Sequence, residues 1–241
     1  MSTNSYPLYA DDSSLREFDA TVVRSGPRYV ILDKTAFYPE GGGQPNDTGV
    51  LSLGGNIVKV LKVKKIGVEI YHYLDANIAN SSRVHGVIDW LPRTWNTRRH
   101  SAEHLLTGLI EELGEPPKFF SSLDQLEYQS SALSETQIRI IGEKFNKIID
   151  DNVPVRIYYE NRMSLDASGD PRKQSFLKKI PINVQQLRMV DIGGYALTFC
   201  MGTHVKSTQE IGPLKDLYLE ETKKGRKIIH FKLMESFTLP T

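Results

Sequence analysis

Hydrophobic and polar residues alternate through much of the first 90 residues, which is the pattern of strands that bury one face. Phe18, Ala20 and Val22 alternate in this way, and Tyr29–Leu32 is a short apolar run. Further strand-like positions are Val58, Val60, Val63, Val68, Ile70, Val84 and Ile88. Turn-forming residues at 25–27 separate these runs. Several short strands with no helix between them predict a small barrel or sandwich.

The pattern changes near Pro92, a residue suited to the first turn of a helix. Apolar residues then recur at helical spacing as far as Leu113, and Gly114 is expected to end the helix. A second helix is predicted after Ser134 and Gln137, which have the spacing of a capping box. The apolar residues of this second helix are Ile138, Ile141, Phe145, Ile148 and Ile149.

The last part of the chain alternates again. Strands are predicted at 153–159, 186–192 and 195–199, followed by a hairpin of 215–220 and 227–233. The polar stretch 164–173 is predicted to be a loop. The expected fold class is therefore α+β, with an N-terminal β module over residues 1–90 and an α+β domain over residues 91–241.

Composition narrows the function classes. Lys and Arg total 30 against 29 Asp and Glu, so bulk positive charge does not hold this chain to nucleic acid. Its one cysteine, Cys200, excludes an internal disulfide and a four-cysteine zinc site. The sequence contains no apolar run of membrane-spanning length, and its N-terminus is unlike a secretory signal. We expect a soluble, cytoplasmic protein.

Four residues have the chemistry of metal ligands. His100 and His104 lie four positions apart on the predicted first helix, so both imidazoles project from one face. Cys200 and His204 repeat that spacing after a predicted strand. Three imidazoles and one thiolate suit a divalent ion such as zinc. Either pair alone is a common structural feature, so the prediction depends on their combination.

The first pair also supports another hypothesis. His100-Ser101-Ala102-Glu103-His104 matches the H-x-x-E-H pattern of one metallopeptidase class, with Glu103 as general base. Cys200 and His204 fit this class poorly, because its site is usually completed by a carboxylate. We therefore expect Glu103 to be a solvated helix residue, and the sequence identifies no catalytic base.

A glycine-rich segment, 37–49, contains Gly41, Gly42 and Gly43 followed by Gln44. It lacks the patterns of a P-loop and of a dinucleotide-binding turn, so no nucleotide cofactor is expected. One interpretation is a tight connection between strands. The interpretation we favour is a loop that lets a ligand approach the main chain.

Together these segments resemble the alanyl-tRNA editing family, which comprises the editing domain of alanyl-tRNA synthetase and free-standing relatives called AlaX. The matching stretches are 35–45, 99–106 and 200–205, with 208–212 also similar, and the resemblance covers about residues 15–235. The length is similar to that of the medium-sized AlaX class. Met201 departs from the family, where glycine is more common; its side chain could narrow the pocket.

The resemblance implies a translation-factor-like β-barrel followed by an α/β two-layer sandwich similar to threonyl-tRNA synthetase editing domains. It implies hydrolysis of tRNA(Ala) mischarged with serine and, as a further candidate, glycine. One zinc ion would be held by His100, His104, Cys200 and His204. Thr35 would sense the serine hydroxyl, and Gln44 is a second polar candidate for the pocket.

For tRNA contacts we favour Arg93, Arg98 and Arg99, which lie near the first histidine. Weaker candidates are the basic clusters at 172–179 and 223–227. We expect a monomer with no membrane partner. A non-catalytic tRNA-binding module with structural zinc is the main alternative to an editing hydrolase, and the metallopeptidase is a third hypothesis.

Overall fold

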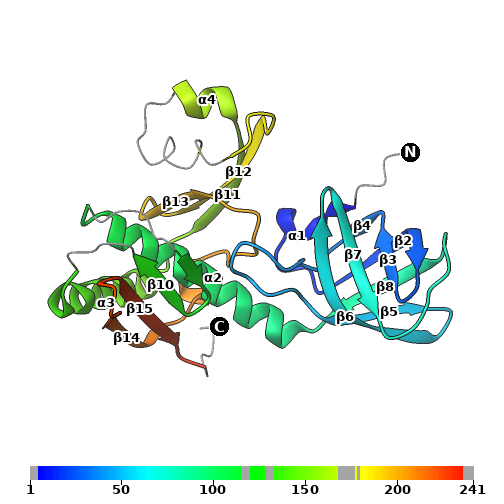
Figure 1. Cartoon of the computed structure of the whole chain (residues 1–241), viewed down its shortest axis with the longest axis horizontal. Coiled ribbons are helices and arrows are strands. Elements are labelled where there is room, and N and C mark those ends of the chain that lie inside the picture. Colours follow the sequence, from blue (N-terminus) through cyan, green and yellow to red (C-terminus); the bar gives the residue numbers. More distant parts are fainter. Residues whose placement is uncertain (1–4, 115–119, 129–132, 168–176, 178–179, 236–241) are drawn as a thin grey trace. The chain divides into compact units, whose positions relative to one another are not determined.

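The computed structural model describes residues 5–114, 120–128, 133–167, 177 and 180–235 (Figure 1). The chain divides into two compact units, Met1–Thr97 and Arg98–Thr241. The division falls inside helix α2 (Trp90–Glu111). A functional domain boundary at residue 90 stays a prediction.

The first unit is a closed antiparallel β-barrel with the strand order β2-β3-β7-β6-β5-β8. Its strands are β2 (Glu17–Gly26), β3 (Tyr29–Leu32), β5 (Gly49–Leu53), β6 (Asn56–Ile66), β7 (Glu69–Leu74) and β8 (Arg83–Ile88). A short helix α1 (Leu8–Asp11) and the parallel pair β1 (Tyr6–Pro7) and β4 (Lys34–Thr35) complete it. The β module predicted from alternation is confirmed as a barrel.

Strand β7 shows how the sequence determines this barrel. Ile70, His72 and Leu74 are buried, whereas the tyrosines between them, Tyr71 and Tyr73, are half-buried. The alternation is that of a strand with one face toward a core and the other toward the outside. Positions 71 and 73 therefore belong to the outer face of the barrel.

The second unit contains the C-terminal part of helix α2 and two β-sheets. One is four-stranded, in the order β14-β15-β10-β9, and the other is three-stranded, in the order β11-β12-β13. The strands are β9 (Phe120–Ser122), β10 (Gln125–Tyr128), β11 (Val155–Asn161), β12 (Gln186–Ile192), β13 (Ala196–Phe199), β14 (Leu214–Glu221) and β15 (Lys227–Leu233). The remaining elements are the helices α3 (Glu135–Asp150) and α4 (Arg162–Ala167) and the 3₁₀ turn η1 (Thr208–Glu210). The α+β class is confirmed.

Helix α3 begins where the capping box predicts. The Gln137 amide donates to Ser134 Oγ at 3.3 Å, and the Ser134 amide donates to Gln137 Oε1 at 2.8 Å. The predicted apolar face of α3 is buried, and the helix packs against β14. Among the described residues, no helix combines the length and apolar character needed to cross a bilayer.

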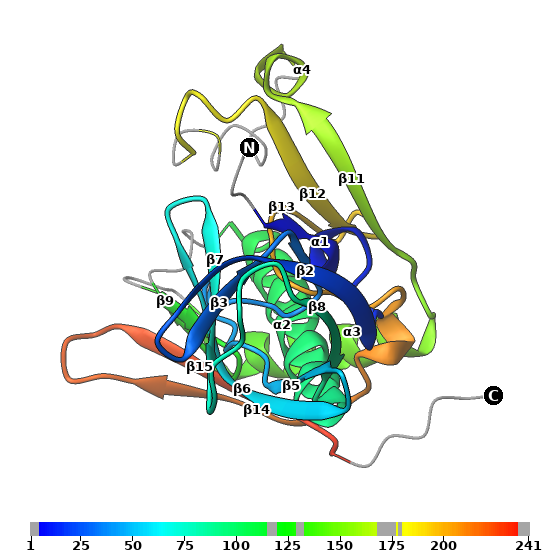
Figure 2. The ribbon, with the colours of Figure 1, turned by 90° about the vertical axis from the view of Figure 1, so that its right-hand side faces the viewer.

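The prediction of a loop at 164–173 is wrong at its start, because α4 extends to Ala167; the remainder of that stretch lies outside the described residues. Figure 2 shows α4 at the end of the long β11–β12 hairpin. Leu165 anchors the helix in a small apolar cluster with Leu177 and Leu187. The Arg162 guanidinium donates to the carbonyls of Leu177, Ile180 and Pro181. These partners are distant in sequence, so local polarity did not reveal the helix.

Candidate metal centre

The structure brings the four predicted ligands together in the second unit. One donor atom from each of His100, His104, Cys200 and His204 lies within 4.8 Å of the other three. His100 Nε2 is 3.2 Å from His104 Nε2 and 3.5 Å from Cys200 Sγ. The imidazoles of His100 and His204 are buried, so these two donors are shielded from solvent.

Two elements supply the ligands. Helix α2 carries His100 and His104 one turn apart, with ring centroids 4.9 Å from each other. The segment that follows β13 carries Cys200 and His204, and the Gly202 amide donates to Cys200 Sγ at 3.3 Å. An amide donor of this kind favours the thiolate, which is the form of cysteine that binds metals.

Close packing between α2 and the β12–β13 hairpin involves Gly108, one turn after His104. A Cβ atom at Gly108 would overlap the Tyr195 carbonyl oxygen and lie 2.9 Å from Ala196 Cα. Only a hydrogen atom fits at this position. Glycine therefore permits the close approach of the helix to the hairpin that leads to the Cys200 segment.

Arg188 supports the Cys200 segment and was not predicted from the sequence. It lies on β12 with its side chain buried, and its Nη1 donates to the carbonyls of Cys200, at 2.5 Å, and Gly202, at 3.1 Å. The Cys200 amide donates to the Arg188 carbonyl at 3.1 Å. A buried guanidinium is costly unless it is well bonded. An isolated arginine in a strand gives no local signal of such contacts.

Ser101 supports His204. Its Oγ lies 3.1 Å from His204 Nδ1 and accepts the Val205 amide at 3.2 Å. A protonated Nδ1 that donates to Ser101 leaves His204 Nε2 as the donor atom for a metal, which is the usual arrangement around ligating histidines. Burial holds the pKa of His204 well below its ordinary value, and the nearby His100, His104 and Arg188 lower it further. The imidazole is therefore neutral, as a metal ligand must be.

Glu103 differs from the prediction of a solvated helix residue, because only 4% of its surface is exposed. Its Oε2 lies 3.8 Å from His104 Nε2. A solvated position was inferred from local spacing alone, and spacing does not show which residues cover a helix position. Glu103 thus places a buried carboxylate beside one of the candidate ligands.

The donor set matches a specific class of ion. Three imidazole nitrogens and one sulfur suit borderline-soft ions that accept tetrahedral coordination, of which zinc is the commonest in proteins. Calcium and magnesium prefer oxygen donors. The cluster therefore fits a transition metal of the zinc type, and four protein donors are enough to complete its coordination.

The glycine-rich segment belongs to the first unit. Gly41 and Gln44 close a tight turn through reciprocal main-chain hydrogen bonds of 3.1 and 3.0 Å. Gly42 and Gly43 have φ values of 57° and 83°, which glycine adopts without strain. The three glycines are exposed, whereas the Gln44 side chain is buried. The tight connection, which was one of the two interpretations of the sequence, is present. The favoured interpretation, a loop that lets a ligand approach the main chain, stays a prediction.

Thr35, two residues before this segment, has none of its surface exposed. Its Oγ1 lies 2.8 Å from His72 Nε2 and accepts the Phe37 amide at 3.1 Å. Burial lowers the pKa of His72 to about 4, so the ring is neutral near pH 7. His72 Nδ1 faces the Val30 carbonyl at 3.4 Å, which favours protonation at Nδ1. Nε2 then accepts the Thr35 hydroxyl proton.

Arg93, predicted as a tRNA contact, instead joins the two ends of the glycine-rich segment. It is fully buried, and Nε donates to both carboxylate oxygens of Asp47 at 3.0 Å. Its other nitrogens donate to the carbonyls of Ser13, at 3.1 Å, and Ala36, at 2.5 Å. With no exposed surface, Arg93 cannot contact a phosphate in this conformation.

Several of the other predicted basic residues also have partners within the chain. Arg98 is buried and donates to the carbonyls of Ile211 and Met234, and burial lowers its pKa. Arg99 pairs with Asp124 at 3.0 Å. In the hairpin cluster, two cations pair with glutamates: Arg226 with Glu127 and Lys227 with Glu221. Four further basic residues lie outside the described residues: Arg172, Lys173, Lys178 and Lys179.

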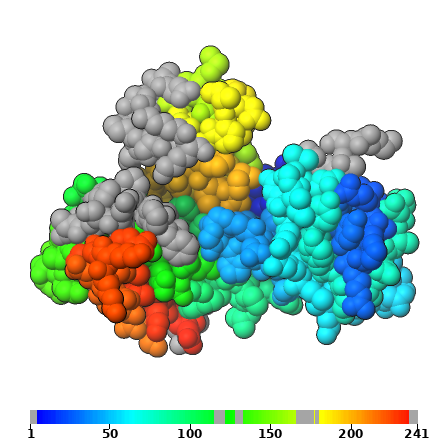
Figure 3. Space-filling model, in the orientation of Figure 1, coloured from blue at the N-terminus to red at the C-terminus, as the bar shows by residue number. Residues whose placement is uncertain are grey.

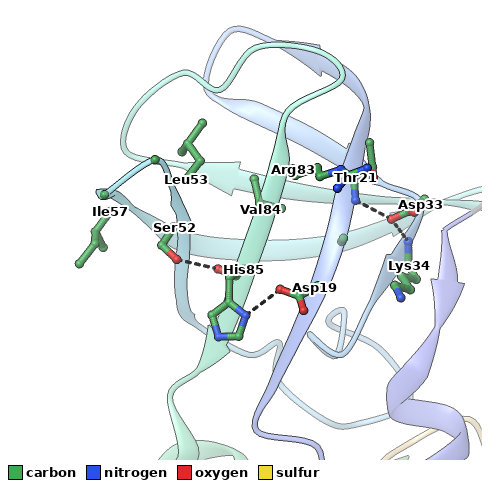
Figure 4. A pocket seen from close by; sticks show the side chains of 13 residues that line it. Asp19, Thr21, Asp33, Lys34, Ser52, Leu53, Ile57, Arg83, Val84 and His85 are labelled. Carbon is green, nitrogen blue, oxygen red and sulfur yellow. Dashed lines mark hydrogen bonds and ion pairs between the residues drawn. The ribbon is translucent and has the colours of Figure 1, made fainter.

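The barrel also carries an open groove of about 850 Å³ (Figure 4). Several of its polar groups form hydrogen bonds with one another. Asp19 accepts a hydrogen bond from His85 Nδ1 at 2.9 Å and raises the pKa of that histidine. Asp33 accepts hydrogen bonds from the backbone amides of Thr21 and Lys34. None of the functional residues predicted from the sequence lines this groove. We assign it no role in the candidate site.

Comparison with known proteins agrees with this architecture. Residues 11–91 match the model of the family described as tRNA synthetases class II (A), and residues 187–234 match that of the threonyl and alanyl tRNA synthetase second additional domain. An alanine–tRNA ligase of Ignicoccus hospitalis is 33% identical over 93% of this chain, but the match covers only 25% of that ligase. The chain thus spans about a quarter of such ligases.

Shorter relatives match from end to end. The alanyl-tRNA editing protein AlaX-M of Methanosarcina acetivorans is 32% identical, over 95% of this chain and 98% of the relative. Its counterpart in Methanosarcina barkeri is 30% identical over the same shares. Three findings together show the family of this chain: the barrel, the match of the second unit to a synthetase domain, and the identity of this order over the full length. The chain belongs to the AlaX-M alanyl-tRNA editing proteins.

Proposed function

We propose that this protein hydrolyses the ester bond of tRNA(Ala) mischarged with serine or glycine and thereby removes the wrong amino acid. The observation that carries the proposal is the buried cluster of three histidines and one cysteine, in a chain that matches AlaX-M proteins over their whole length. Hydrolysis of an ester needs a polarised carbonyl and an oriented water, and a metal site in a protected pocket can supply both requirements.

The physical need for such a reaction is clear. Serine exceeds alanine by one hydroxyl and glycine lacks one methyl, and binding pockets separate such small differences poorly. A second site that hydrogen-bonds the serine hydroxyl discriminates better, because alanine would leave its buried polar groups unpaired. This argument applies most directly to serine, so we propose serine as the main substrate.

We propose that zinc occupies the cluster, with His100, His104, Cys200 and His204 as its ligands. When bound, it supplies the Lewis acidity that polarises an ester carbonyl. The chain's own contribution is orientation: Ser101 fixes the ring of His204, and Arg188 fixes the carbonyls on either side of Met201. A side chain at position 201, next to Cys200, would restrict the space beside the metal.

Thr35 is our candidate for sensing the serine hydroxyl, with Gln44 as a second polar group. The Thr35 hydroxyl gives its proton to His72 and accepts the Phe37 amide. It retains a lone pair, so it can accept a hydrogen bond from a serine hydroxyl but cannot donate one. Because Thr35 has no exposed surface, this contact requires a conformation in which the substrate reaches its hydroxyl. Thr35→Val should abolish serine hydrolysis and keep zinc. Unchanged hydrolysis of Ser-tRNA(Ala) by this variant would contradict the assignment.

A second candidate function is a non-catalytic tRNA-binding module. The observation in its favour is that four protein donors can close the coordination shell of zinc, as in structural sites. The metallopeptidase hypothesis has less support, because the donors that complete the cluster with His100 and His104 are a cysteine and a histidine, whereas that class usually uses a carboxylate ligand.

One assay separates these functions. Ser-tRNA(Ala), Gly-tRNA(Ala) and correctly charged Ala-tRNA(Ala) are each incubated with the purified protein, with and without a chelator, and the released amino acid is measured. We expect rapid release of serine, slower release of glycine, protection of alanine, and loss of release with the chelator. Equal hydrolysis of Ala-tRNA(Ala) would contradict editing, and tight tRNA binding without any release would favour the binding module.

The variant that tests the metal site directly is Cys200→Ala. It removes one of the four donor atoms but leaves His100 and His104 on helix α2. We expect it to lose both stoichiometric zinc and deacylation. Full activity without bound metal would refute the role proposed for the cluster. If the wild type cleaves peptides and Glu103→Gln abolishes this cleavage, the result would instead support the metallopeptidase hypothesis.

A further inference from the structure

A group of aromatic and basic side chains gathers on the outer face of the barrel. We call it the tyrosine–lysine face and define it as Tyr29 on β3, Tyr71 and Tyr73 on β7, and Lys62 and Lys64 on β6. Strand β7 lies between β3 and β6 in the barrel. In Figure 3 the surface of β6 and β7 appears among the cyan atoms of the first unit.

Strand register places these side chains in rows. Tyr73 is opposite Tyr29 on one side and Lys62 on the other, and Lys64 is opposite Tyr71. The residues that alternate with them, including Val30 and Val63, are buried in the barrel. Cross-strand neighbours on one face lie close enough to act together. The five residues therefore lie next to one another on the outer face of the barrel, whereas Ile31, which is opposite Tyr71 on β3, is buried.

The three tyrosine rings pack against one another, and the Arg24 guanidinium lies 5.6 Å from the centroid of the Tyr71 ring. Tyr29 and Tyr71 have centroids 5.3 Å apart, Tyr71 and Tyr73 are stacked at 6.4 Å, and Tyr29 lies 6.5 Å from Tyr73. All three are half-buried. Aromatic rings held in this way on a barrel give planar surfaces on which unpaired bases can stack.

Charge on and around the face is positive. Arg24, Lys62 and Lys64 are balanced only in part by Glu69, which pairs with Arg24, and Glu40, which pairs with Lys62 at 3.1 Å. Three cations against two carboxylates leave a net charge of +1. Lys64 is exposed and has no ion-pair partner among the described residues. It is thus available for a phosphate, unlike the buried Arg93.

We propose that the tyrosine–lysine face binds a single-stranded segment of the tRNA. The proposal rests on the proposed function, because hydrolysis of a mischarged tRNA requires the protein to bind RNA. The net charge of the whole chain is only +1, so local groups on the surface must provide that binding. Bases within a duplex are covered by their neighbours, so only unpaired nucleotides can stack on these rings, while Lys62 and Lys64 contact the phosphates between them.

The experiment measures binding of a short fluorescein-labelled single-stranded RNA, and of the same RNA as a duplex, to the full chain over a range of salt concentrations. The variants are Tyr73→Ala, Tyr73→Phe and the double substitution Lys62→Ala with Lys64→Ala. The matched controls are Tyr6→Ala and Lys34→Ala, which change exposed residues of the first unit outside the face. Thermal unfolding checks that each variant is folded.

We expect the wild type to prefer the single strand. Tyr73→Ala should weaken binding about tenfold, whereas Tyr73→Phe, which keeps the ring, should bind nearly as well as the wild type. The double lysine variant should reduce the slope of log K against log salt by about 0.7 per lost phosphate contact, or about 1.4 in total. Both control variants should bind like the wild type.

The proposal is wrong if the folded variants of the face bind the single strand like the controls, or if the wild type prefers the duplex. An effect on binding to a protein partner but not to RNA would also overturn it. Hydrolysis of Ser-tRNA(Ala) by the wild type is measured in parallel. Normal hydrolysis with unchanged RNA binding in the variants refutes only this face, whereas absent hydrolysis with the expected binding changes refutes only the catalytic function.

Discussion

Arg188 holds Cys200 from both sides: its carbonyl accepts the Cys200 amide at 3.1 Å, and its guanidinium donates to the Cys200 carbonyl at 2.5 Å. Arg188→Met should release the segment that carries the thiolate and weaken metal binding about 10- to 100-fold, as loss of supporting contacts does at other metal sites. Competition with a chelator measures the affinity, and cobalt substitution reports the sulfur–metal charge-transfer band.

The control is Arg156→Met on the neighbouring strand, where the arginine is largely exposed and pairs with Asp191. This variant should bind metal like the wild type. If Arg188→Met also leaves the affinity and the cobalt spectrum unchanged, Arg188 does not position the site.

The pair of Arg93 and Asp47 should dominate the stability of the first unit. Asp47→Ala leaves a fully buried guanidinium without its carboxylate, and breaking a buried pair in this way costs about 3–5 kcal/mol. Chemical denaturation measures the change. Asp19→Ala, at an exposed carboxylate, should change the free energy of unfolding by less than about 0.5 kcal/mol. Equal effects of the two substitutions would contradict this role.

Two helical glycines should respond in opposite ways to the same substitution. Gly108→Ala places a methyl group against the Tyr195 carbonyl and should destabilise the protein by about 1–3 kcal/mol and weaken metal binding. Gly142→Ala on α3 meets its nearest atom, in Leu217, at 3.4 Å and should be neutral or stabilising by up to about 1 kcal/mol. Unfolding curves and metal titrations of both variants test the contrast.

Burial of neutral His72 should make stability depend on pH. Its pKa falls from 6.5 to about 4 on folding, so the unfolded chain binds more protons between these values and stability drops as the pH is lowered through this window. Between pH 7 and pH 5 the contribution of His72 should fall by about 2 kcal/mol. The same pH change should cost His72→Gln about 2 kcal/mol less than the wild type; an equal loss in both proteins would refute the assignment.

Sequence periodicity was a good guide wherever one face of an element is buried. It placed 186–192 as a strand at the bounds that β12 has, and the capping box located the start of α3. It missed β9 and β10, because both are short and polar and acquire their order from pairing with each other and with β15.

For the candidate site, too, the sequence predicted what depends on local spacing and missed what depends on distant residues. Spacing within each ligand pair identified all four members of the cluster, because that spacing is local. Spacing could not reveal that Arg93 and Glu103 are buried, since burial depends on residues far away in the chain. The contacts of Arg188 and Ser101 with the ligand segment likewise join positions that periodicity does not connect.

Ser101 stands beside His100 in the chain but serves His204, 103 residues later. The segment His100–His104 therefore encodes more than two ligands, since it also sets the ring orientation of a third. Grafting only the four donor residues onto another scaffold would transfer the metal ligands. It would leave behind the Ser101 hydroxyl that orients the ring of His204. The transplantable unit is the five-residue block of the helix, together with the strand that presents Arg188.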